Sequence, residues 1–175
     1  NYSGFVDLQV NGYRGVDFNS DQLTSCDVVR VCQQLREENV AGILATVITD
    51  DIDAMCRRLA NIRDIHEANP LVSKVIWGIH IEGPFLNEQS GFIGAHSPAA
   101  AQWADLTQMN RLLDAAGDLV RIVTLAPERD VRCKVTRLLA DRGIRVAAGH
   151  CDPSMDQLRA GIDAGHGGHC ADLGA

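Results

Sequence analysis

Short apolar runs alternate with longer segments whose apolar residues recur at helical spacing, and the alternation repeats five times along the chain. The short runs predict strands and the longer segments predict amphipathic helices. Most of the expected strands are continuous apolar runs, which is typical of parallel strands covered on both faces. The expected strands are residues 4–10, 42–49, 75–82, 120–126 and 145–150.

Two of the longer segments also predict where their helices begin or end. Asp130 can cap the start of the helix after the fourth strand, and Gly143 comes just after its end. Ser154, with Gln157 three residues later, forms the pattern of a capping box. The apolar faces are Ile52, Met55, Leu59 and Ile62 within residues 51–66, and Val131, Val135, Leu138 and Leu139 later in the chain.

Two α/β architectures accept successive βα units, a doubly wound sheet and a closed (βα)8 barrel of the TIM type. Polar residues at the strand ends favour the barrel, because a barrel gathers the carboxyl ends of all its strands around one mouth. A doubly wound sheet would concentrate them at one switch point, usually with a G-x-G-x-x-G loop, which this sequence lacks. The polar residues in question are Gln9, Asn11, Thr49, Glu82, Glu128 and His150.

The size of the chain sets a limit on this barrel. A full (βα)8 barrel needs roughly 200 to 250 residues, whereas this chain has 175 and about five units. We therefore expect residues 1–175 to form one partial barrel domain of an incomplete chain, with open parallel edges.

Charge and composition exclude several classes of partner. The chain has 16 basic and 23 acidic residues, a net charge of −7, and no basic cluster, so nucleic acid and anionic membrane surfaces are not expected partners. It has no apolar run of the roughly 20 residues that span a bilayer, and no secretory signal pattern at its amino end. We expect a cytoplasmic protein whose six cysteines are reduced.

The ends of the third and fifth expected strands offer the sharpest chemistry, beginning with a His-x-Glu pair. His80 and Glu82 are two residues apart on a strand and project to the same side, so both could face one ion. His150 ends another apolar strand, and imidazole and carboxylate groups are suitable ligands for Zn²⁺. The alternative is that Glu82 only binds backbone amides and that His150 is structural.

The first strand lacks the histidine pair that a site for two metal ions would need. Its alternation places Asp7, Gln9 and Asn11 on one face. Many metal-dependent hydrolases carry His-x-His at this position and hold two ions with its help. Because the neutral amides of Gln9 and Asn11 bind zinc poorly, a single-metal site is expected.

Three stretches together resemble the N-acetylglucosamine-6-phosphate deacetylase family of amidohydrolases. They are GFVDLQVNG (4–12), GIHIEGPFLN (78–87) with GFIGAH (91–96), and AAGHCDPSMDQLRAGIDAG (147–165). The resemblance implies metal binding by Glu82 and His150, with Ala95 and His96 lining the substrate site. It also implies a homodimer, and one divalent ion, zinc, that acidifies water for attack on an acetyl group.

The chain departs from that family pattern near its end. The family supplies a third ligand from a T-H-x-x-N-A-like stretch, and His169 stands near the expected place without that motif. His166 is expected to be solvated or a fortuitous match. The catalytic Asp of the family comes from a later strand, and Asp172 lies too early to take that role, so the general base is unassigned.

The resemblance implies removal of acetate from a phosphorylated amino sugar, N-acetylglucosamine 6-phosphate. Two other functions stay open. One is a different amidohydrolase, such as a cyclic amidase or a deaminase, which the loop at residues 91–96 argues against. The other is a relative without its base and third ligand that serves as a binding or interaction module, because a barrel alone does not define a function.

Overall fold

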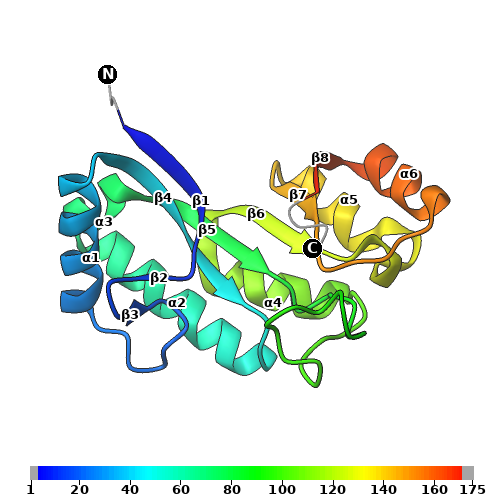
Figure 1. Cartoon of the computed structure of the whole chain (residues 1–175), viewed down its shortest axis with the longest axis horizontal. Helices are drawn as coiled ribbons and strands as arrows, with labels where there is room; N and C mark the ends of the chain where they lie inside the picture. The colour runs from blue at the N-terminus through cyan, green and yellow to red at the C-terminus, as the bar shows by residue number, and fades with distance from the viewer. Residues whose placement is uncertain (1–3, 171–175) are drawn as a thin grey trace.

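A computed structural model describes residues 4–170, with the side chains of residues 4–165. Its main feature is a curved six-stranded parallel sheet (Figure 1). In spatial order the strands are β1 (Phe5–Val10), β4 (Val40–Ile48), β5 (Ile76–Glu82), β6 (Val120–Leu125), β7 (Arg145–Ala148) and β8 (His166–Cys170). A small antiparallel hairpin, β2 (Gly12–Tyr13) and β3 (Val16–Asp17), follows the first strand.

Helices connect the parallel strands, and the core lies between them and the sheet (Figure 1). They are α1 (Ser25–Glu37), α2 (Ile52–Ala68), α3 (Pro70–Val75), α4 (Leu106–Ala116), α5 (Lys134–Asp141) and α6 (Met155–Ala164). Three short 3₁₀ turns add η1 (Gly117–Leu119), η2 (Pro127–Arg129) and η3 (Val131–Cys133). Leu59 of α2, Met109 of α4 and Ile79 of β5 are fully buried in this core.

The strand order confirms a partial βα barrel. Each new parallel strand adds to the same edge of the sheet, so spatial order follows chain order without the reversal of a doubly wound sheet. All five predicted strands are present, each within two residues of its predicted ends. The prediction of five strands missed β8, whose His-Gly-Gly-His-Cys sequence has no apolar run.

The helix signals were confirmed except at the start of α5. The capping box of Ser154 and Gln157 is formed, and Gly143 follows α5 with a positive φ of 72°. Asp130 does not begin the helix directly, because the η3 turn intervenes and α5 begins at Lys134. The Asp130 carboxylate still accepts hydrogen bonds from the first-turn amides of α5, and Val131, predicted on the apolar face, is 60% exposed.

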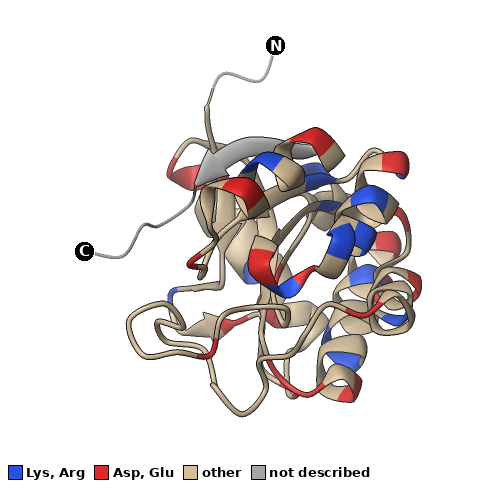
Figure 2. Cartoon of the chain, turned by 90° about the vertical axis from the view of Figure 1, so that its right-hand side faces the viewer, with Lys and Arg blue, Asp and Glu red and all other residues tan. Residues whose placement is uncertain are grey.

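The surface carries both acidic and basic residues, as the composition of the chain implies. Figure 2 shows acidic and basic residues interspersed on the helices of the face that it presents. Within residues 4–165, Cys26, Cys32, Cys56 and Cys133 are free thiols, as predicted. The described helices include none with the length and apolar character needed to cross a membrane.

Candidate metal and active site

Glu82 is the last residue of β5, and its backbone is held between two neighbouring strands. The Thr49 hydroxyl donates a 3.0 Å hydrogen bond to the Glu82 carbonyl oxygen. The amide of the next residue, Gly83, donates to the carbonyl of Thr124 at the end of β6, at 2.9 Å. Glu82 is 6% exposed, and its carboxylate faces the carboxyl ends of the strands. Its position is therefore fixed by the ends of β4 and β6.

His150 lies just beyond the end of β7 in a backbone conformation that few non-glycine residues adopt. Its φ is +51°, and such a conformation persists only where the surrounding structure maintains it. The Nδ1 atom lies 2.9 Å from the carbonyl oxygen of Phe92, and the His150 carbonyl accepts from the Asn87 amide at 2.9 Å. The loop after β5 thereby orients the ring of His150.

His96 reaches the same place from that loop. It is 8% exposed, and its ring meets the His150 ring edge to face, with centroids 4.4 Å apart. Gly94 permits this approach, because its φ is +60° and a Cβ atom there would lie 3.1 Å from Cε1 of His150. The Nδ1 atom of His96 is buried and has no hydrogen-bond partner among the described residues.

The donor atoms of Glu82, His96 and His150 form a small triangle. Glu82 Oε1 lies 3.1 Å from His150 Nε2 and 3.7 Å from His96 Nε2, and the two imidazole nitrogens are 3.2 Å apart. Tetrahedral zinc, with ligand distances of about 2.0 to 2.2 Å, places two donor atoms about 3.3 to 3.6 Å apart. These three residues can therefore hold a divalent cation.

The protonation of His150 supports the same conclusion. A carbonyl oxygen only accepts, so the Nδ1 atom facing Phe92 carries a proton, and Nε2 is the atom directed at Glu82. The 3.1 Å contact between Nε2 and the carboxylate is favourable when a proton or a cation lies between the two atoms. Burial would raise the pKa of the Glu82 carboxyl, but hydrogen bonds with His150 and His96 outweigh it and hold that pKa well below its ordinary value.

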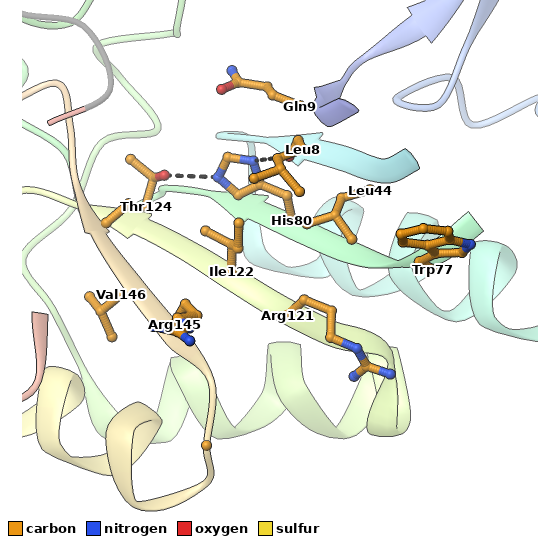
Figure 3. A pocket seen from close by; sticks show the side chains of 12 residues that line it. Leu8, Gln9, Leu44, Trp77, His80, Arg121, Ile122, Thr124, Arg145 and Val146 are labelled. Carbon is orange, nitrogen blue, oxygen red and sulfur yellow. Dashed lines mark hydrogen bonds between the residues drawn. The ribbon is translucent and has the colours of Figure 1, made fainter. Parts of the chain in front are cut away.

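The geometry separates His80 from this group. Its Nδ1 donates to the Leu8 carbonyl at 3.2 Å, and its Nε2 accepts from the Thr124 hydroxyl at 2.8 Å. Burial lowers the pKa of His80 despite the opposing charge of Glu82 nearby, which keeps the ring neutral. His80 therefore ties β1 and β6 to β5 across the inner face of the sheet (Figure 3).

The other predicted site residues lie at different distances from the cluster. The Gln9 amide donates to Glu82 Oε2 at 3.0 Å, whereas Asn11 is exposed at the start of the turn into the hairpin. Ala95 is exposed beside His96. The backbone of His169 lies in β8, and its side chain is outside the described residues, as is the whole of Asp172.

Glu128, predicted at the mouth, has a structural role in the described chain. One of its oxygens accepts from the Asn87 side chain at 2.9 Å and from the Asp152 amide at 2.6 Å. These bonds join the loops that follow β5, β6 and β7. Glu128 therefore supports the cluster without belonging to it.

A cavity of about 690 Å³ lies on the inner face of the sheet, on the opposite side of the strands from the helices (Figure 3). Leu44, Ile122 and Val146 form part of its apolar floor, and His80 and Gln9 lie toward the strand ends. In a barrel this face is the interior. The cluster thus stands at the mouth of a partly enclosed barrel.

No model of a known protein family matches the chain. The N-acetylglucosamine-6-phosphate deacetylase of Bacillus subtilis is 30% identical over 164 residues, which are 93% of this chain and 40% of that protein. The N-acetylgalactosamine-6-phosphate deacetylase of Shewanella sp. is 35% identical over 168 residues, or 95% of this chain and 40% of that protein. The resemblance to these deacetylases is confirmed.

The solved structures of deacetylases agree in fold. An N-acetyl-D-glucosamine-6-phosphate deacetylase from Mycobacterium smegmatis, solved with N-acetyl-D-glucosamine 6-phosphate, has a TM-score of 0.81 and 32% sequence identity. The match covers 94% of this chain and 41% of that one. This chain therefore spans about 40% of the length of the deacetylases that it matches.

Proposed function

We propose that this chain carries the metal-binding part of the active site of a metal-dependent amide hydrolase. The substrate class is an N-acetylated hexosamine 6-phosphate, from which the enzyme removes acetate, and N-acetylglucosamine 6-phosphate is the first compound to test. The observation that carries the proposal is the triangle of Glu82, His96 and His150 donor atoms at the mouth of a partial barrel. The deacetylase relatives, which act on both sugar epimers, support the substrate class.

Glu82 and His150 would hold the cation, and His96 supplies the third donor atom within residues 4–165. The donor set of two nitrogens and one oxygen favours zinc. When bound, such a cation polarises an amide carbonyl and makes water more acidic. The Glu82 carboxylate would supply the negative charge of the site, and His150 would present Nε2 to the cation because its Nδ1 faces Phe92.

The residues that would contact the substrate, and a further candidate metal ligand, are assigned by resemblance to the deacetylases. Ala95, exposed next to the cluster, would contact the sugar. His169 stays a prediction as a metal ligand, and it would compete with His96 for the third position. The general base is unassigned, since Glu82 is the only carboxylate in the cluster among the described residues. A homodimer and a cytoplasmic location are also carried over as predictions.

The test measures metal content and acetate release together. The unmodified chain is compared with Glu82→Gln and His150→Ala, using N-acetylglucosamine 6-phosphate and N-acetylgalactosamine 6-phosphate as substrates. Glu67→Gln, the same change at an exposed position of α2, is the matched control. We expect about one ion per chain with Glu67→Gln and little with the other two variants.

The outcomes separate the possible functions. Metal binding with acetate release, both lost in Glu82→Gln, would support a deacetylase and place a general base in this chain. Metal binding without acetate release would favour a chain that supplies only part of a catalytic set. Release of ammonia from an aminated ring or opening of a cyclic amide would support another amidohydrolase. Absence of metal from the purified chain, even after incubation with zinc, would reject the metal centre.

A further inference from the structure

Gln9 and Glu82 are brought together from strands that are not neighbours. β1 and β5 are separated by β4 in the sheet, yet the Gln9 side-chain amide reaches the Glu82 carboxylate with a 3.0 Å hydrogen bond. Figure 3 shows Gln9 at one end of the cavity, on the side of β1. The bond therefore spans the mouth of the partial barrel.

The two oxygens of Glu82 have different partners. Oε1 faces the nitrogens of His150 and His96, whereas Oε2 accepts from Gln9. A carboxylate can bind a cation through one oxygen or both. A donor on Oε2 competes with a cation for that oxygen and fixes the plane of the carboxylate, so Oε1, the oxygen that faces the imidazoles, would be the one to bind the cation.

An irregularity in β1 directs Gln9 toward Glu82. The pairing of β1 with β4 shifts register between Asp7 and Val10, so Gln9 lies in the irregular part of the strand. The backbone amide of Gln9 donates to the Asp7 carboxylate at 3.0 Å. Bulges of this kind redirect a side chain next to active sites, and Asp7 stabilises the irregular backbone by binding that amide.

From these contacts we infer that Gln9 is a positioning residue, which holds Glu82 as a one-oxygen ligand, and that Asp7 keeps Gln9 in place. Gln9 itself does not bind the cation, because its nitrogen is a donor and points at the carboxylate. The inference rests on the proposed function, since it assigns a role toward the same cation. Outer-shell partners of a metal ligand orient it and raise the affinity for the ion.

The experiment uses Gln9→Met, which keeps the length of the side chain and removes the N–H donor. Asn11→Leu is the matched control, because Asn11 is an exposed amide two residues along and makes no side-chain hydrogen bond to the described part of the chain. Zn²⁺ affinity is measured by competition with a chelating dye. The Co²⁺-loaded proteins are compared by their visible absorption, which reports ligand geometry.

We expect Gln9→Met to weaken Zn²⁺ binding about 10- to 100-fold and to change the Co²⁺ spectrum. Asn11→Leu should leave both unchanged. The melting temperature of the metal-free Gln9→Met protein should also stay unchanged, because Gln9 is exposed. If Gln9 had a purely structural role, the substitution would lower that melting temperature.

Two results would overturn the inference while leaving the metal centre intact. One is wild-type affinity and spectrum in Gln9→Met, and the other is an equal loss in Gln9→Met and Asn11→Leu. Failure of the unmodified chain to bind Zn²⁺ or Co²⁺ would instead overturn the proposed metal centre, and this inference with it.

Discussion

His96 joins the cluster from a loop, whereas Glu82 ends β5 and His150 lies just beyond β7. The sequence predicted the place of Glu82 and His150 because residues at the ends of parallel strands converge. No periodicity places a loop residue, so resemblance alone assigned His96, and it assigned a substrate contact. The structure sets His96 Nε2 3.2 Å from His150 Nε2, which brings it within the donor triangle.

The first prediction tests the proposed role of His96 as a metal ligand. We expect His96→Ala to reduce the zinc affinity by more than the roughly 10- to 100-fold typical of a lost outer-shell partner, because one of three donor atoms is removed. Metal content after dialysis and the zinc dissociation constant are the measurements. His66→Ala, a histidine of α2 that contacts the Ile76 carbonyl, should keep its metal. If His96→Ala holds zinc normally and only raises KM, His96 is a substrate contact and His169 becomes the stronger candidate.

Gln9 illustrates a second kind of residue that the sequence only half predicted. The alternation of side chains along the first strand placed Gln9 on the same face as Asp7 and Asn11, and its neutral amide made it a poor zinc ligand. The contact with Glu82 depends on the register shift in β1, which the apolar pattern does not contain. The spacing Asp7-x-Gln9 was the one available signal, because Asp side chains often bind the amide two residues on.

At the scale of elements, the loop between β5 and α4 sets up the site. It carries Asn87, Phe92, Gly94 and His96, and it holds His150 through two hydrogen bonds. The sequence did not predict the path of this loop, since loops have no repeating pattern. β8 was missed for a related reason, because its glycines and histidines do not form an apolar run.

The second prediction tests this loop through a pair of glycines. Gly94 and Gly91 both have positive φ, so alanine strains the backbone at either position. A Cβ atom at Gly94 would lie 3.1 Å from the His150 ring, whereas one at Gly91 meets nothing within 4 Å. We expect Gly94→Ala to weaken zinc binding at least about 10-fold by displacing His150, and Gly91→Ala to cost only about 1 kcal/mol of stability.

Zinc titration together with urea unfolding separates the two effects. The unfolding midpoints of both variants should fall by a similar amount, because both carry the same kind of strain. Only Gly94→Ala should also lose affinity for the ion. Equal zinc affinities would mean that the His150 ring tolerates the methyl group and that the loop does not fix its position as tightly as the contact distance implies.

At the scale of the whole molecule, the sequence predicted a series of parallel strands joined by helices. The choice between a barrel and a doubly wound sheet depended on the polar residues at the strand ends. Continuous apolar runs suit a doubly wound sheet and a barrel equally well. Gln9, Glu82 and His150 favoured the barrel because they are polar residues at the ends of different strands, and in the structure the three do converge. The small β2–β3 hairpin carried no such signal.

The third prediction uses two cysteines of α1 to ask whether the described sheet and helices form a stable core. Cys26 is exposed near the start of the helix, and Cys32, six residues later, is fully buried. Burial raises the pKa of the Cys32 thiol from 9.0 to about 11, so its thiolate fraction near pH 8 falls about 100-fold. We expect iodoacetamide to label Cys26 quickly and Cys32 at least about 100-fold more slowly, as followed by mass spectrometry of peptides.

The pH dependence gives the same prediction a second measurement. Since the folded pKa of Cys32 exceeds the unfolded one, its contribution to stability is fully present below about pH 9 and is lost as the pH rises to about 11. Cys32→Ala should remove this part of the alkaline loss of stability, which other groups share. Similar labelling rates for Cys26 and Cys32 in the native chain, as expected in urea, would show that α1 opens freely. The sheet would then lack the rigid support on which the Glu82, His96 and His150 triangle depends.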